Sequence, residues 1–249
     1  FAYTNLTNLL ILFSNMKMGP LHWSNFSTGM NQSIAKLIIN VTVITRNHLT
    51  PEIPLHLLTP SCKLWSAKES DVPFKDPYWA FYWPGGQALS RYLLDNPEVV
   101  RGRRVLDLGS GSGACAIAAA KSGAKLVTAN DIDETACVAT GINAQLNNLK
   151  LEITNENLIG STDIRWDCMV VGDLFYDRMF AVELLRWIRL WVLGGKDVYI
   201  GDPRRLRLVR KYLEKVAEYR IPSEVNVESI EFPKAEVWKF TKEKFEQTI

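Results

Sequence analysis

The sequence predicts an α/β fold built on one mostly parallel sheet that ends in an antiparallel hairpin. Three observations lead to this prediction: strands alternate with helices from residue 104 onward, a glycine-rich loop follows the first of these strands, and no helix separates the last two strands. Strands that alternate with helices form βαβ units, in which the strands run in parallel. The 249 residues, 47% of them apolar and 22% charged, suffice for one domain with a full core.

The spacing of apolar residues and turn signals predicts each element in order. Residues 47–78 contain five prolines and are expected to form an extended lead-in with short strands, and a helix starts at the turn Pro84-Gly85-Gly86. The predicted strands of the alternating region are 104–108, 125–130, 151–153, 167–172 and 196–201, and the predicted helices are 114–121, 134–149, 178–191 and 204–219. Residues 224–232 and 235–241 are expected to pair as the terminal hairpin, which brings the sheet to seven strands.

The loop after the first strand carries Gly109, Gly111 and Gly113 at alternate positions. Glycine has no Cβ and tolerates positive φ, so a ligand can lie directly against such a loop. In open α/β sheets this place binds nucleotide-like ligands, and the spacing to Ala114 also fits a dinucleotide-binding motif. The preceding Asp107 favours a different ligand, because its carboxylate would repel a pyrophosphate but attract the ammonium and sulfonium of S-adenosylmethionine. A dinucleotide stays open as the alternative.

Two further residues are expected to bind the same ligand. Asp131 ends the second strand 22 positions after Gly109, where a carboxylate can accept both ribose hydroxyls. Its alternative role is to cap the next helix, but Asp133 suits that position at least as well. Asn157, which follows the third strand, is expected to contact the edge of the adenine, and a turn-forming role is its alternative.

The fourth predicted strand, 167–172, leads into a run with polar and aromatic side chains that extends from Asp173 to Asp177. Ligands in open α/β folds bind at the carboxyl ends of the strands, where the strand order reverses. We therefore expect Asp173 to hold, by hydrogen bonds, an amine that attacks the methyl group of the donor. We expect the ring of Tyr176 to shield and orient the cationic nitrogen of that amine. The structural alternative, in which Asp177 caps a helix and Phe175 lies in the core, leaves the role of Asp173 unchanged.

Together these motifs resemble those of the seven-strand protein-lysine methyltransferases, whose motif after the fourth strand is D-x-F-Y. The resemblance covers residues 46–249 and rests on the glycine loop, on the approach from Trp83 to Gly86, and on the run from Asp173 to Tyr176. It implies the Rossmann-like, seven-stranded sheet of class I methyltransferases, S-adenosyl-L-methionine as cofactor, a protein lysine as substrate, a monomeric enzyme, and a cofactor contact by Trp83. Transfer to another protein or a small molecule, and a non-catalytic module that kept the loop, stay open.

The N-terminal region differs in composition from the rest of the chain. Its first 51 residues contain no Asp or Glu but three basic residues, as in a mitochondrial transit segment, although an unstructured extension has the same composition. We therefore expect residues 1–45 to be a targeting or disordered segment and residues 46–249 to form a single domain. The family resemblance implies that the protein lies in the mitochondrial matrix, with the cytoplasm as a further location.

Charge and cysteine content exclude several other classes. Residues 52–249 carry 26 basic and 27 acidic residues, so binding to nucleic acid by counterion release is not expected. The four cysteines lack the spacing of a metal site, and no apolar run approaches the length of a membrane span. The basic cluster at residues 204–211 is interpreted either as the solvated face of the predicted helix 204–219 or as a docking surface for an acidic partner.

Overall fold

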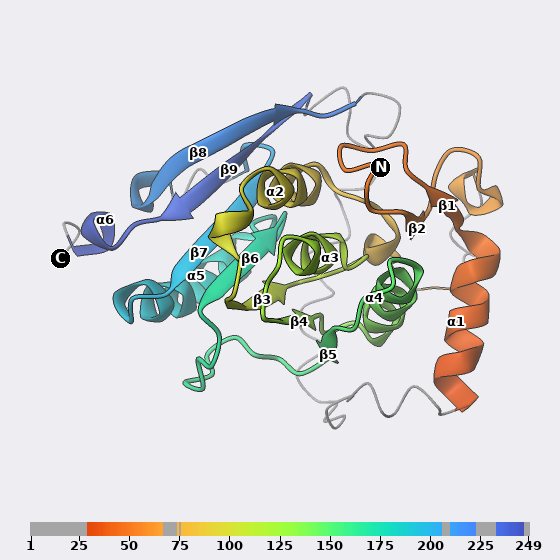
Figure 1. Cartoon of the computed structure of the whole chain (residues 1–249), viewed down its shortest axis with the longest axis horizontal. Coiled ribbons are helices and arrows are strands. Elements are labelled where there is room, and N and C mark those ends of the chain that lie inside the picture. The colour runs from red at the N-terminus through yellow and green to blue at the C-terminus, as the bar shows by residue number, and fades with distance from the viewer. Residues whose placement is uncertain (1–28, 67–73, 75, 206–209, 223–232, 247–249) are drawn as a thin grey trace.

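A seven-stranded sheet lies at the centre of the computed structural model, which describes residues 29–66, 74, 76–205, 210–222 and 233–246 (Figure 1). The strand order is β5-β4-β3-β6-β7-β9-β8. Neighbouring strands from β5 to β7 are parallel, whereas β9 pairs antiparallel with both β7 and β8. The predicted fold class is therefore confirmed. The strands are β3 (Arg104–Leu108), β4 (Leu126–Asn130), β5 (Glu152–Thr154), β6 (Cys168–Gly172), β7 (Asp197–Asp202), β8 (Leu213–Arg220) and β9 (Lys234–Phe240).

Strands β3 to β7 lie within one residue of their predicted bounds because their sequences suit a sheet that is covered on both faces. Successive side chains of a strand point to opposite faces. In β3, Val105 joins the core on one face, whereas Leu106 and Leu108 join the core on the other. In β6 the buried residues alternate in the same way. Burial on both faces explains why these strands are continuous apolar runs and not alternating patterns.

Helices cover both faces of this sheet (Figure 1). Helices α2 (Pro84–Asp95), α3 (Ala114–Lys121) and α4 (Glu134–Leu146) lie on one face, and α5 (Arg178–Leu193) lies on the other. A short helix, α6 (Lys242–Glu246), follows β9. Among the helices of the described ranges, none is both long and apolar enough to cross a membrane.

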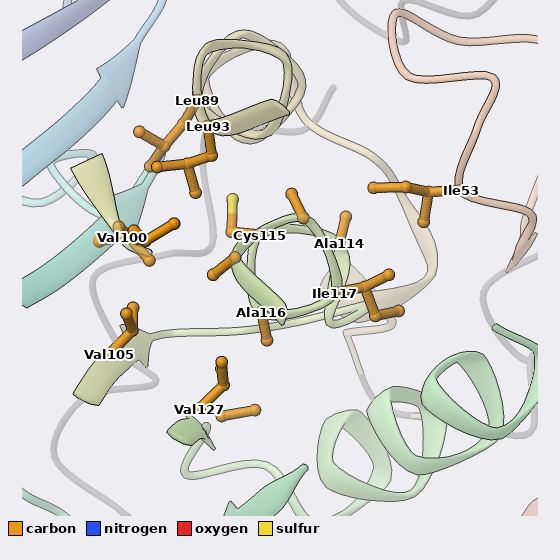
Figure 2. Close-up of a cluster of buried hydrophobic side chains, with 14 of the residues drawn as sticks. Ile53, Leu89, Leu93, Val100, Val105, Ala114, Cys115, Ala116, Ile117 and Val127 are labelled. Carbon is orange, nitrogen blue, oxygen red and sulfur yellow. The ribbon is translucent and has the colours of Figure 1, made fainter. Parts of the chain in front are cut away.

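Helix α3 sits in the middle of its layer (Figure 2). Its side chains are mostly small, and those of Ala116 and Ala119 are 0% exposed. The larger apolar residues around it come from α2, from the lead-in and from the sheet, with Leu89, Ile53 and Val127 as examples. Because alanine lets a helix approach its neighbours closely, α3 can begin directly at the end of the glycine loop without leaving a void.

The predicted helix 204–219 is wrong. Its second half is the edge strand β8, and its described first half holds only a short 3-10 turn, Arg210–Tyr212. The prediction rested on apolar residues three or four positions apart. In the structure Leu213 packs on the α5 face of the sheet, whereas Val216 and Ala217 pack on the α2 face, and the pairing of β8 with β9 shifts register between Lys215 and Ala217. Pairing with β9, which is distant in sequence, decided between the two periods.

The terminal hairpin is confirmed in kind, but its first strand differs from the prediction. The predicted strand 224–232 lies outside the described residues. The partner of β9 is β8, whose residues from Leu213 to Arg220 pair with those from Phe240 back to Lys234. The second strand agrees with the prediction within one residue at each end.

The folded part of the chain extends further toward the N-terminus than the expected boundary at residue 45. Helix α1 (Gly29–Val41) packs against α4, and β1 (Val43–Thr45) pairs antiparallel with β2 (Leu55–Leu57). Ile38 of α1 is 0% exposed and shares a core cluster with Trp79 and Ala139. Composition alone did not indicate this helix, because its apolar face is short. Residues 1–28 lie outside the described ranges.

Candidate functional site

The glycine loop joins β3 to α3, and each of its three glycines has positive φ: 69° at Gly109, 51° at Gly111 and 81° at Gly113. The space around them differs. A Cβ at Gly109 would lie 2.7 Å from the Leu174 side chain, and one at Gly113 would lie 2.8 Å from that of Thr140. A Cβ at Gly111 would meet no atom nearer than 3.7 Å. Packing within the protein therefore explains Gly109 and Gly113, whereas Gly111 marks the uncrowded part of the loop.

Hydrogen bonds fix the loop to the end of β4 and to α4. The backbone N–H groups of Gly109 and Ser110 both donate to the Asn130 carbonyl, at 2.8 and 2.9 Å. The Thr140 hydroxyl donates to the Gly111 carbonyl at 3.1 Å, and the Asn143 amide donates to that of Ser112 at 2.9 Å. The loop is thus held to β4 and α4 by hydrogen bonds within the protein.

Asp107 is buried, with 1% of its surface exposed. Its carboxylate accepts a hydrogen bond at 2.8 Å from the backbone N–H of Ala116, in the first turn of α3, where a negative charge is favourable. Burial raises the pKa of Asp107 to about 7, although the bond from Ala116 works in the opposite direction. The Asp107 carboxylate, which is expected to attract a positively charged ligand, is therefore buried within the protein.

Asp131 lies at the end of β4, beside the glycine loop. Its carboxylate accepts hydrogen bonds from the backbone N–H groups of Gly111 at 2.9 Å and Asp133 at 3.1 Å. Burial raises the pKa of Asp131 to about 6. Asp133, not Asp131, caps α4, because it accepts the hydrogen bond from Thr135 N–H at 2.8 Å. The capping alternative for Asp131 is thus wrong, and its carboxylate sits directly against Gly111.

Asp173 follows β6 and is only 8% exposed. One carboxylate oxygen, Oδ2, accepts a hydrogen bond of 2.7 Å from Gly86 N–H in the first turn of α2. The other, Oδ1, lies 3.2 Å from the guanidinium of Arg205. The backbone of Asp173 has φ of 56°, a left-handed conformation that few non-glycine residues adopt. The structure therefore brings two motifs of the sequence together, because the segment from Trp83 to Gly86 and the run from Asp173 to Tyr176 meet at this carboxylate.

Aromatic side chains surround this end of the sheet. Tyr176 is 54% exposed and its ring stacks on that of Phe180. Desolvation and the negative charge of Asp131 raise the pKa of Tyr176, so the phenol is neutral and within electrostatic reach of that carboxylate. Trp83 precedes α2, and its indole N–H donates to the Tyr78 carbonyl at 2.9 Å. The rings of Trp83 and Tyr78 lie 6.3 Å apart, next to Phe81.

Asn157 is exposed, and its side-chain oxygen accepts a hydrogen bond at 3.2 Å from Ile159 N–H. This is the turn-forming role that the sequence left open. The predicted contact between Asn157 and an adenine stays a prediction. Asp177 caps α5 by accepting from Phe180 N–H at 2.8 Å, and Phe175 is 7% exposed, so the structural alternative for these two residues is confirmed.

Several polar residues that hold the site together are not indicated by any motif in the sequence. Asn130 and Thr140 are 2% and 0% exposed, and both bind the glycine loop or its surroundings. Their signal in the sequence is a polar side chain at a position that the apolar spacing assigns to the core. In the sequence Arg205 belongs to the basic cluster at residues 204–211, and nothing in its neighbours indicates a partner 32 positions earlier.

The sheet order, the glycine loop and the acids that end β4 and β6 define a class I S-adenosylmethionine-dependent methyltransferase. The antiparallel β9 belongs to this class and not to dinucleotide-binding folds. The ligand alternative left open by the glycine spacing is thereby decided in favour of S-adenosylmethionine.

Comparisons with the sequences of known proteins agree with this class. The family profile of ribosomal protein L11 methyltransferase (PrmA) matches residues 87–172. The chain is 46% identical over 221 residues to the electron transfer flavoprotein beta subunit lysine methyltransferase of Danio rerio, covering 86% of each chain. It is 44% identical over 230 residues to the protein of the same name from Homo sapiens, covering 89% of this chain and 87% of the human one. A crystal structure of ribosomal protein L11 methylase from Lactobacillus delbrueckii subsp. bulgaricus superposes with a TM-score of 0.48 at 22% identity, over 62% of this chain and 77% of that one. The chain belongs to the family of electron transfer flavoprotein beta subunit lysine methyltransferases.

Proposed function

We propose that this chain transfers methyl groups from S-adenosylmethionine to lysine side chains of the electron transfer flavoprotein beta subunit, the substrate that the names of its relatives state. One observation carries the proposal: the candidate amine-binding residue Asp173 and the glycine loop lie side by side. Leu174, which follows Asp173, packs so closely on Gly109 that a Cβ there would clash at 2.7 Å. A methyl donor on the loop and an amine at Asp173 would therefore be neighbours.

The residues on the donor side fit S-adenosylmethionine. Gly111 leaves room for a ligand to lie against the backbone, and the Asp131 carboxylate beside it can accept the ribose hydroxyls. Trp83 and Asn157 are assigned to the donor's outer contacts. Asp107, with Gly109 and Gly113, acts by fixing the loop and α3, since each of these residues is engaged within the protein.

The donor supplies a methyl carbon bonded to a positive sulfur, and transfer forms the nitrogen–carbon bond as the carbon–sulfur bond breaks, which leaves a neutral thioether. The chain's own residues act chiefly by positioning, because the donor already carries the activation. Asp173 orients the amine through its carboxylate, and Tyr176 shields the nitrogen with its ring. The amine must lose its proton to attack, and we assign this proton to solvent and not to Asp173.

The test of this proposal uses the full chain with a labelled methyl donor. The acceptors are purified electron transfer flavoprotein and, separately, a mitochondrial extract. Label on lysines of the beta subunit, and one labelled band of that mass in the extract, is the expected result. Label on a different protein or on a small molecule, with none on the beta subunit, contradicts the assigned substrate. Absence of any transfer by well-folded protein that binds the demethylated donor indicates a non-catalytic module.

We further propose that the protein acts in the mitochondrial matrix. The support is the acid-free composition of the first 51 residues. Because α1 begins at Gly29 and packs on α4, residues 1–28 are the part assigned to import. Fusions of residues 1–28 and 1–50 to a fluorescent protein should both enter mitochondria. Cytosolic fluorescence from both fusions contradicts the proposal, whereas import by the longer fusion alone places part of the signal in residues 29–50.

A further inference from the structure

The ion pair between Asp173 and Arg205 stands out because both side chains are largely removed from water. Their exposed fractions are 8% and 15%, and the two charged groups lie 3.2 Å apart. Removing two charges from water is costly, so a pair of this kind is weak evidence for a stabilising role. Its place at the residue that we assign to the amine points instead to a role in the reaction.

The backbone after β7 is shaped to deliver Arg205 to this place. Asp202, the last residue of β7, is 0% exposed, and its carboxylate accepts a hydrogen bond from Arg205 N–H. Between them, Arg204 has φ of 86°, in the left-handed region. The side chain of Arg204 turns away to Glu236, 3.6 Å distant. Arg204 and Arg205 therefore have different partners, and of these two arginines it is Arg205 that reaches the candidate site.

A positive charge at this position changes the proton balance of an amine beside Asp173. A carboxylate by itself favours the charged ammonium form, which cannot attack a methyl carbon. A guanidinium is not deprotonated in proteins, so its positive charge is permanent. With Arg205 in place the pair carries no net charge, so the carboxylate can orient the amine without holding its proton.

We propose that Arg205 is a positioning residue: it fixes the Asp173 carboxylate and, through its permanent charge, favours the neutral form of the amine that this carboxylate orients. The inference rests on the proposed function, because it takes Asp173 as the group that orients the amine. It also assigns a role to one arginine of the basic cluster, for which the sequence offered only a solvated face or a docking surface.

Other titratable groups lie around the pair and must be considered in a pH experiment. Asp202 comes from β7, and α2 contributes the backbone N–H of Gly86. Cys115 of α3 interacts electrostatically with both Asp173 and Asp107, the latter from β3. Burial, with the nearby charges of Asp107 and Asp173, raises the pKa of the Cys115 thiol well above its usual range, so it stays neutral. Asp107 has a pKa of about 7 and titrates within the assay range. It does so in every variant, and the comparison between variants therefore isolates Arg205.

The experiment measures kcat against pH from about 6 to 10, with electron transfer flavoprotein and methyl donor both saturating, because kcat reports ionisation in the enzyme–substrate complex. The variants are Arg205→Met, Arg205→Lys and, as a matched control, Arg101→Met, which alters an exposed arginine before β3 at the opposite end of that strand. In Arg205→Met, we expect the rising part of the kcat–pH profile to move to higher pH by roughly one unit. The kcat of this variant should therefore fall about tenfold at low pH and recover at high pH. Arg205→Lys should shift the profile less, and Arg101→Met should follow the unchanged protein.

Several outcomes overturn the inference. A loss in Arg205→Met by the same factor at every pH, or one matched by a lower melting temperature, indicates a purely structural residue. An unchanged profile shows that the charge does not act on the amine. If Arg205→Met is unstable, the test rests on Arg205→Lys, which keeps the positive charge. A shift of its kcat–pH profile by the full pH unit expected for loss of the charge contradicts the inference. If the unaltered chain methylates no lysine of the flavoprotein at any pH, the proposed function fails and this inference with it.

Discussion

Gly85 and Gly201 meet backbone to backbone where α2 crosses the end of β7. A Cβ at Gly85 would lie 2.2 Å from the Gly201 carbonyl oxygen, and one at Gly201 would lie 2.0 Å from that of Gly85. No real Cβ atom tolerates these distances. The first turn of α2 therefore rests directly on the sheet, and this approach brings Gly86 N–H within hydrogen-bond reach of Asp173.

Substitution Gly85→Ala should destabilise the protein, because the added methyl group must displace the backbone of β7. We expect a loss of about 1–3 kcal/mol in the free energy of unfolding, the usual effect of overpacking. Gly86→Ala is the matched control on the same helix turn, since its Cβ would meet no atom nearer than 3.7 Å. Chemical denaturation of both variants measures the difference, and equal stabilities would show that α2 can shift freely on the sheet.

Substitution Asp131→Ala should weaken binding of the demethylated cofactor product. Two charge-assisted hydrogen bonds to the ribose would be lost, at about 1.5–3 kcal/mol each. Asp133→Ala is the control, because it removes the α4 cap and should cost about 0.5–2 kcal/mol of stability while leaving the affinity near normal. Isothermal titration calorimetry reports both affinities. Unchanged binding by Asp131→Ala, or tighter binding of NAD than of the product, would refute the ribose assignment.

Substitution Asp173→Asn should lower kcat/KM far more than it lowers stability or cofactor affinity. Asparagine keeps an oxygen that can accept from Gly86 N–H, so the α2 contact can persist. Loss of the negative charge that orients the amine should cost about 2.7–4 kcal/mol, or roughly 10²–10³ in rate, by analogy with oxyanion donors. Rates, cofactor affinity and melting temperature are measured together. A rate loss fully accounted for by unfolding or by weaker cofactor binding would indicate a structural carboxylate.

Stability should depend on pH through Asp107, whose pKa of about 7 in the folded protein exceeds the usual value of a free carboxyl group. The folded state then holds a proton that the unfolded state has lost, so stability falls as pH rises toward 7 and levels off above it. In Asp107→Asn this contribution is absent. Relative to the unaltered protein, the variant should gain stability between pH 5 and 7 by at most about 1.4 kcal/mol per pH unit. Denaturant titrations at pH 5, 6, 7 and 8 test this, and a difference that is constant with pH would contradict it.

Substitution Ile38→Ala should destabilise the fold by about 2–5 kcal/mol, because the side chain is fully buried between α1 and α4. Ile39→Ala is the matched control, since the neighbouring Ile39 is 49% exposed. Thermal melting of the two variants separates a structural helix from a dispensable leader. Similar melting temperatures of the two variants would indicate that α1 lies outside the folded domain.

Most of the central sheet could be predicted because its signals are local. Each strand from β3 to β7 is an apolar run bounded by turn residues, and glycine and aspartate mark the ends at which ligands bind. β8 could not be predicted in this way. Leu213 and Val216 have a spacing that also suits a helix, and the choice between the two depended on a partner strand that follows more than ten residues later.

The candidate site shows the same division. The residue types of Asp107, Asp131 and Asp173 follow from the chemistry of the ligand, and the structure places all three at the strand ends expected for them. Their burial and partners could not be inferred, because Ala116, Gly111 and Arg205 reach them from other elements. The sequence shows which side chains lie near the end of a strand. Whether each of them is buried or exposed to solvent depends on hydrogen bonds from other elements.

The position of β9 has a consequence for biosynthesis. β9 lies between β7 and β8, although both of these strands precede it in the chain. While the polypeptide emerges from the ribosome, β7 therefore has a bare edge until about residue 240 is free to insert. Exposed edges of this kind recruit strands of other molecules. Nascent chains halted before β9 should accumulate as aggregates, whereas chains released a few residues after it should close the sheet and remain dispersed.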